Sequence, residues 1–163
     1  MIVDRKKRVM KKFVVRNFYQ ILGYAGVLPF ALFAVGLYLS SSNPIMGNLM
    51  LVMQMVYGAI IISFLSGAHW SGAVRDKNML RMCFSILPTI LLLPIIFWGM
   101  SNSPMQALLM MIAVLWGVFA MDRGYFYYRS GDEASMPRGY ILYRFNLTML
   151  VSIILGATYW IAS

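Results

Sequence analysis

The chain has 163 residues, of which 61% are hydrophobic and 12% are charged, against roughly 25% charged residues in an average soluble domain. This length allows one domain, and a soluble fold of this size cannot hide so much apolar surface, because its surface is large relative to its volume. The sequence therefore predicts a membrane protein. The net charge of +9 is confined to short blocks, which argues against a nucleic-acid partner.

Residues 1–19 are predicted to form a basic amphipathic arm in the cytoplasm. Hydrophobic residues recur there at helical spacing, and the basic residues between them are Arg5, Lys6, Lys7, Arg8, Lys11, Lys12 and Arg16. Such a helix can lie on the anionic inner leaflet of a lipid bilayer, and its charge can also set the orientation of the chain. We expect either role or both.

Residues 20–163 are predicted to form one transmembrane domain. A helix that crosses a hydrocarbon layer of about 30 Å needs about 20 mostly apolar residues. Runs of this kind predict spans at about 20–39, 46–70, 82–100, 104–121 and 145–162. A β-barrel would require strands of alternating polarity, whereas residues 86–98 are apolar on every face. Prolines 29, 88 and 94 predict kinks in the first and third spans.

Basic residues occur only in alternate connections of this domain. They precede the first span and lie between spans two and three and between spans four and five, while the remaining connections carry no charge. Under the positive-inside rule, this pattern predicts an all-α bundle of five transmembrane helices with the N-terminus in the cytoplasm and the C-terminus outside. The first span is longer than the apolar region of a cleaved signal peptide, so we expect an uncleaved anchor.

The second span carries two features that favour helix packing. Small residues recur there every four positions, at Ala59, Ser63, Gly67 and Ser71. Small side chains let helix backbones approach closely within a membrane, either inside the bundle or between two copies of the chain. Gln54 and Tyr57 are the most polar groups deep in this span, and they predict interhelical hydrogen bonds or the lining of a narrow path.

The candidate functional cluster comprises His69, Trp70, Asp122 and Arg144, which the predicted topology places at the inner membrane face. Ionisable groups at a membrane are functional candidates, and histidine is the side chain most suited to changing its charge near neutral pH. For His69 the alternative is an interfacial group that donates to a loop. Asp122 and Arg144 form either a buried ion pair or two solvated charges.

The sequence favours a protein that is not an enzyme. It has one cysteine, Cys83, and one histidine, and it shows no spacing typical of metal ligation or nucleophilic catalysis, so we expect no metal and no cofactor. Two functions are favoured over a third, an intramembrane enzyme acting on lipid or quinone. One is an accessory or assembly partner of a membrane complex, or a homo-oligomer, which acts through helix association. The other is a small-molecule or proton-linked transporter that uses His69, Asp122 and Arg144.

Several segments resemble one known family over about residues 20–160. They are Gly23–Phe30, Tyr57–Ala59, Ser63–Trp70, Asp122, Tyr143-Arg144 and Leu147-Thr148. These segments are similar to the family that includes transmembrane protein 69 of mitochondria and its bacterial relatives, the domain of unknown function 3429. The resemblance implies a small multi-pass protein of bacterial inner membranes and mitochondria with no established reaction. The short basic N-terminus, without a long serine-rich transit peptide, favours a bacterial inner membrane, with the mitochondrial inner membrane as the eukaryotic counterpart.

Overall fold

A computed structural model of the protein describes residues 20–128 and 139–163, without the side chains of residues 125–128. The predicted basic arm, residues 1–19, lies outside the described residues. Within the described part every regular element is helical, and five helices are long and apolar enough to cross a membrane: Gln20–Leu39, Pro44–Arg75, Met79–Ser101, Pro104–Gly124 and Tyr140–Ala162. The predicted all-α class with five spans is confirmed, while the orientation in the membrane stays a prediction.

The first span is interrupted near its start. Residues 20–25 are helical, Gly26 and Val27 form a turn, and helix α2 then runs from Leu28 to Leu39. Pro29 lies in the first turn of α2, where proline is well tolerated because its missing N–H would have no partner within the helix. Pro29 therefore lies at the start of a new helix. At the turn before it, the Gly26 carbonyl oxygen accepts a hydrogen bond from the Tyr57 hydroxyl of α3 at 2.9 Å.

The other helices are α3 (Pro44–Arg75), α4 (Met79–Ser101), α5 (Pro104–Tyr128) and α6 (Tyr140–Ala162). Several extend beyond the predicted spans, because hydropathy marks only the apolar part of a helix whereas capping groups and hydrogen bonds set its ends. The Asn43 and Asn78 side chains cap α3 and α4 by accepting from the backbone N–H groups of Met46 and Arg81. Helix α4 continues through both of its internal prolines.

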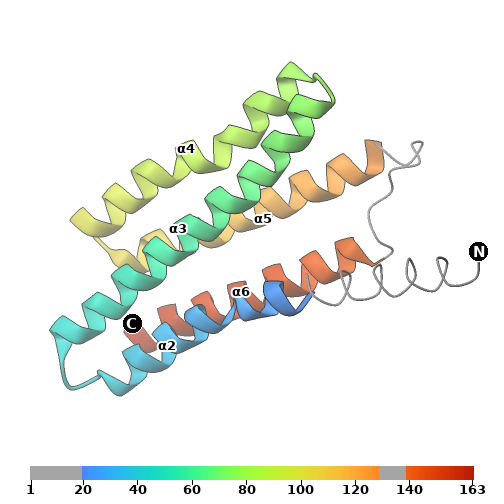
Figure 1. Ribbon diagram of the computed structural model, residues 1–163. Helices are drawn as coiled ribbons and strands as arrows, with labels where there is room; N and C mark the ends of the chain where they lie inside the picture. Colours follow the sequence, from blue (N-terminus) through green and yellow to red (C-terminus); the bar gives the residue numbers. More distant parts are fainter. Residues whose placement is uncertain (1–19, 129–138) are drawn as a thin grey trace, which may run out of the picture.

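The helices form two layers, as Figure 1 shows. Helices α3, α4 and α5 pack against one another in one layer, and α2 packs beside α6 in the other. Contacts of α2 with α3 and of α5 with α6 join the two layers. The connection at residues 76–78 and the start of α6 therefore lie at the same end of the bundle as the start of the first span (Figure 1).

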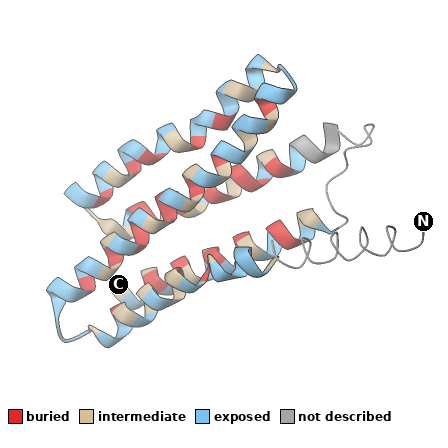
Figure 2. Ribbon diagram, in the orientation of Figure 1, coloured by how far each residue is buried: buried red, intermediate tan, exposed pale blue. Residues whose placement is uncertain are grey.

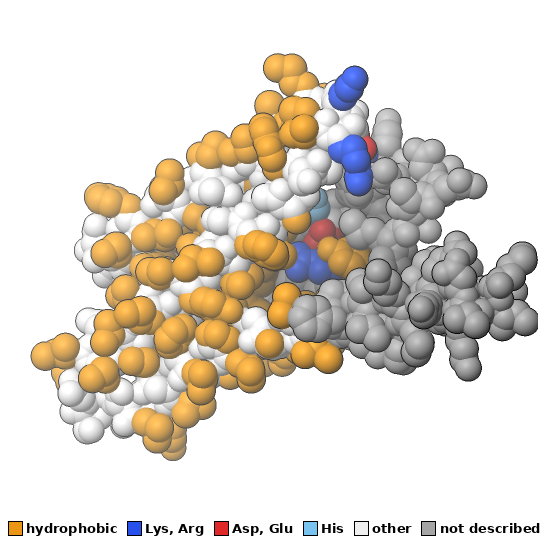
Figure 3. Space-filling model, viewed as in Figure 1, with side chains coloured by type: hydrophobic (Ala, Val, Ile, Leu, Met, Phe, Trp, Pro, Cys, Tyr) orange, Lys and Arg blue, Asp and Glu red, His pale blue; other side chains and the backbone are white. Residues whose placement is uncertain are grey.

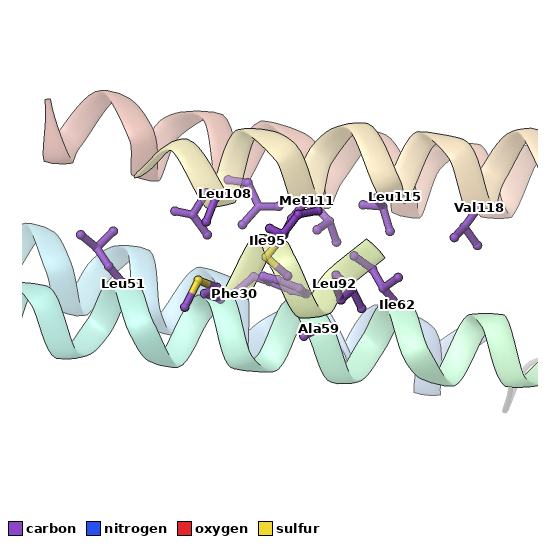
Figure 4. Packing of buried hydrophobic residues seen from close by; sticks show 14 of the residues in the cluster. Phe30, Leu51, Ala59, Ile62, Leu92, Ile95, Leu108, Met111, Leu115 and Val118 are labelled. Atoms are coloured by element: carbon purple, nitrogen blue, oxygen red, sulfur yellow. The ribbon is translucent and has the colours of Figure 1, made fainter. Parts of the chain in front are cut away.

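Buried apolar side chains from the two layers meet inside the bundle, whereas the outward faces are exposed (Figure 2). Phe30 on α2 meets Ala59, Leu108 and Met111 of the other layer in the core shown in Figure 4. Large apolar side chains also cover the outside: Leu39, Phe64 and Phe97 are 73%, 73% and 74% exposed. Lipid accepts this surface, whereas in water it would form an unusually large apolar patch.

Helices α4 and α5 approach each other closely at Gly99. A Cβ atom at Gly99 would lie 2.6 Å from the Cβ of Ala107 and 2.6 Å from the Sδ of Met55. The Ala107 methyl group is fixed to the α5 backbone and cannot rotate away. Gly117 provides a contrast, because it is an exposed helical glycine with no atom within 4 Å of a Cβ placed there.

We therefore expect Gly99→Ala to lower the free energy of unfolding by about 1–3 kcal/mol, the usual cost of overpacking a core. The measurement is the fraction of detergent-solubilised protein that stays monodisperse after heating. Gly117→Ala is the matched control and should keep or slightly raise stability, since alanine favours helix more than glycine does. Equal behaviour of the two variants would contradict the close contact of α4 with α5.

Candidate functional site

Within the described residues, every charged side chain lies at one end of the bundle. They are Arg75, Asp76, Lys77, Arg81, Asp122, Arg123 and Arg144. On the face shown in Figure 3, the visible charged side chains and the histidine gather at that end, while hydrophobic side chains are spread over the rest of the described surface. The described part of the opposite end has no charged residue. This one-sided distribution is the pattern from which the membrane orientation is predicted.

At this end three charged or ionisable side chains from three helices meet. The Nε2 atom of His69, on α3, lies 3.1 Å from Oδ1 of Asp122, on α5. Arg144, on α6, places both Nε and Nη2 at 2.8 Å from Oδ2 of the same carboxylate. The side chains are 14%, 7% and 9% exposed, respectively. The structure thus pairs Asp122 with Arg144 inside the bundle and adds His69 as a second partner, whereas Trp70 is 41% exposed.

Helix periodicity explains why these three side chains converge. Residues three or four positions apart share one face of a helix. His69 stands three after buried Ser66 and four before buried Ala73 on α3. Asp122 stands three and four after the buried residues Phe119 and Val118, and Arg144 stands four before buried Thr148. Each therefore lies on the inward-facing side of its helix, close to the charged end of the bundle.

The arrangement is an ionic junction, and we use this name for His69, Asp122 and Arg144. One carboxylate accepts from a guanidinium and an imidazole, so the negative charge is compensated in a place with little water. An isolated buried charge is strongly unfavourable, whereas a paired one with further hydrogen bonds is tolerated. The junction therefore ties α3 and α5 in one layer to α6 in the other.

A polar cavity of about 180 Å³ adjoins the junction. The three junction residues line it together with Arg75 and Tyr140. Arg75 and Tyr140 are not among the candidate site residues predicted from the sequence. Neither has a local signal for the cavity, because the cavity forms only where α3, α5 and α6 come together. The described residues include no group of three or more His, Cys, Asp or Glu side chains that could hold a metal ion.

The start of the first span also packs against this region. The Tyr143 hydroxyl donates to the Gln20 carbonyl oxygen at 3.2 Å, and its ring lies edge-on to Tyr24 with centroids 5.5 Å apart. A Cβ atom at Gly23 would lie 1.6 Å from the Tyr143 oxygen, so only glycine fits here. A glycine inside an apolar helix is the sequence signal that could have indicated this close approach.

The small-residue stripe on α3 does not stay on one side of the helix. Ala59 is buried in the core, Ser63 is half-buried, and Gly67 and Ser71 are exposed. Each step of four residues turns about 40° around an α-helix, so three steps carry the stripe from the inside to the outside. Gly67 has no atom within 4 Å of a Cβ placed on it.

Gln54 and Tyr57 both make interhelical hydrogen bonds. Gln54 Nε2 donates to the Thr158 hydroxyl oxygen at 3.0 Å, and Thr158 in turn donates to the Ile154 carbonyl oxygen at 2.9 Å. Gln54 and Thr158 are completely buried, and Tyr57 bonds to Gly26 as described above. These groups join α3 to α6 and to the interrupted first span.

Comparison with known proteins identifies one family. A family model described as a protein of unknown function, DUF3429, matches residues 15–160. No curated protein and no solved structure matches the chain.

The ionic junction predicts a large effect of removing one partner. Asp122→Ala leaves Arg144 buried without its counter-charge, and we expect a loss of about 3–5 kcal/mol in the free energy of unfolding. The double variant Asp122→Leu with Arg144→Met removes both charges and should recover much of that loss. Stability of the solubilised protein against heat measures both.

The control for this comparison is Asp76→Ala, which removes an ion pair at the surface. Asp76 Oδ2 lies 3.1 Å from Nη1 of Arg81, and these side chains are 23% and 26% exposed. Exposed pairs contribute about 0–1 kcal/mol, so a small change is expected. If Asp122→Ala were no more harmful than Asp76→Ala, the junction would not hold the helices together.

Proposed function

The chain belongs to DUF3429, a family of unknown function, and we propose that it acts without enzymatic chemistry, as an accessory or assembly partner within a membrane complex. We place it in the bacterial inner membrane, with the mitochondrial inner membrane as the eukaryotic counterpart. The proposal also includes the predicted orientation, in which the charged end faces the cytoplasm. It rests on the outward face of α3, the longest helix of the described bundle.

This outward face repeats every seven residues. One row consists of Met53, Ile60, Gly67 and Val74, and a second row, three positions further along, consists of Val56, Ser63 and Trp70. All are exposed except half-buried Ser63. Two rows at this spacing form the seam along which helices pack. We call this surface the α3 seam.

The α3 seam has a shape suited to a partner helix. Bulky Ile60 and Val74 are 59% and 47% exposed, and they flank Gly67, around which space is open. Between membrane helices, small residues beside larger ones allow close backbone approach and van der Waals packing, which drive association where lipid is as apolar as leucine. The ionic junction supports this role because it fixes α3 relative to α5 and α6.

The test is native mass spectrometry of the full chain, extracted in a mild detergent after crosslinking in the membrane. We expect a homodimer or a defined complex that Gly67→Leu disrupts by at least about tenfold, equivalent to about 1.4 kcal/mol. Gly117→Leu on α5 is the matched control, since Gly117 is also exposed with open space. A strictly monomeric protein, or equal loss in both variants, would refute association through the α3 seam.

A second candidate function is a small-molecule or proton-linked transporter. The observation in its favour is the position of His69, Asp122 and Arg144 on a cavity of about 180 Å³. Buried ionisable groups that line cavities are characteristic of proton relays in membrane transporters. This hypothesis requires a further conformational change, because side chains such as Met55 and Leu108 fill the core beyond the junction.

Reconstitution into liposomes with an internal pH-sensitive dye distinguishes this candidate. A transporter should show proton or substrate-coupled proton flux that His69→Ala abolishes, because alanine cannot carry a proton. Trp70→Ala, at the exposed neighbouring position, is the control and should retain the flux. Absence of flux above protein-free liposomes, or equal flux in wild type and His69→Ala, would exclude His69 as a proton carrier.

A further inference from the structure

A second, apolar cavity lies beside the polar one. Its volume is about 340 Å³, within the range of about 300–1,000 Å³ that is usual for ligand pockets. It is lined by the interrupted first span, α3 and α6, and α5 contributes Leu115. Apolar side chains such as Phe30, Leu65 and Leu147 form most of its wall. This lining suits a hydrocarbon chain.

The two cavities adjoin at a common wall. Leu65, Tyr140 and Arg144 line both of them. A single ligand that occupies both would have its apolar part between the first span and α6 and its polar part beside the junction. Arg144 stands where these two parts of the ligand would meet.

The described wall of the polar cavity has more basic than acidic side chains. Among the described residues that line it, Asp122 is the one carboxylate, and Arg75, Arg144 and His69 are the basic residues. Arg144 directs Nε and Nη2 at one oxygen of Asp122, and its Nη1 atom makes no hydrogen bond with the described residues. The Arg75 side chain is 67% exposed and lies 4.0 Å from Asp76, a carboxylate that also pairs with Arg81. An anion would balance this surplus.

We propose that the two cavities bind one anionic phospholipid, with an acyl chain in the apolar cavity and the phosphate at Arg75 and Arg144. A free inorganic anion would leave the apolar cavity without an occupant. A neutral amphiphile would leave the basic surplus unbalanced. Lipid is also the solvent of this bundle, so the ligand is present at high concentration. This site goes beyond the proposed function, because it requires neither the α3 seam nor flux.

The experiment is a titration of the full-length, delipidated protein in detergent micelles, read by native mass spectrometry. The probes are phosphatidylglycerol and phosphatidylcholine with identical acyl chains, together with inorganic phosphate. We expect one tightly held phosphatidylglycerol per chain, with a preference over phosphatidylcholine of about fivefold, as expected for one basic side chain near an anionic headgroup. Inorganic phosphate should not displace the bound lipid.

Two variants test the two parts of the site without changing the ionic junction. Ile61→Trp fills the apolar cavity, which Ile61 lines, and should abolish the tightly held lipid. Ile60→Trp, at the adjacent position that is 59% exposed, is its control. Arg75→Gln should remove most of the preference for phosphatidylglycerol, while Lys77→Gln, at a position outside the lining of both cavities, should keep it.

Three results would overturn the site. The first is equal binding of the two phospholipids by the wild-type protein. The second is retention of the tightly held lipid in Ile61→Trp, and the third is its displacement by inorganic phosphate. Thermal stability of each variant, measured in parallel, identifies any variant that has unfolded, and Ile61→Phe then replaces Ile61→Trp with the same expected loss.

Discussion

The structure depends on the carboxylate of Asp122 on α5, which pairs with side chains from two other helices. Asp122 is held by Arg144 from α6 and by His69 from α3, and all three side chains are largely buried. The apolar packing that fills the rest of the bundle is weakly directional. Lipid tails are as apolar as the side chains, so an apolar side chain gains little by moving from lipid into the bundle. A buried charge is different, because an arrangement of the helices that separates it from its partners leaves it uncompensated and costs free energy. The junction therefore selects one arrangement of the two layers at the charged end.

This constraint explains why the cavities lie where they do. Around Phe30, Leu108 and Met111 the layers are joined by interlocking apolar side chains (Figure 4). Near the junction, the layers are joined by long polar side chains, while the Tyr143 contact holds α6 to the first span within one layer. Long side chains bridge helices without filling the volume between them. The interruption at Gly26 and Val27 lies on the wall of the apolar cavity.

Much of this fold could be predicted from sequence because each helix satisfies its own backbone hydrogen bonds within a long apolar run. The residues of the junction were also found from sequence, since ionisable groups are rare next to apolar spans. Their pairing could not be deduced, because it depends on the rotation of three helices about their axes. The α3 stripe shows the same limit: its spacing of four is regular along the chain, yet Ala59 is buried and Gly67 is exposed. The cavities were missed because they belong to the space between helices.

Arg144 connects the structural role of the junction to the ligand proposed for the cavities. The same guanidinium that holds Asp122 lines both the apolar and the polar cavity. An anion bound there would share Arg144 with Asp122, so its binding free energy would depend on how firmly the carboxylate is held by His69. By thermodynamic linkage, a bound anion would in turn change the stability of the contact between α3 and α5. The α3 seam is the outward face of α3, the same helix that takes part in this contact. Lipid bound at the charged end and a partner helix bound at the seam would therefore act on the same helix.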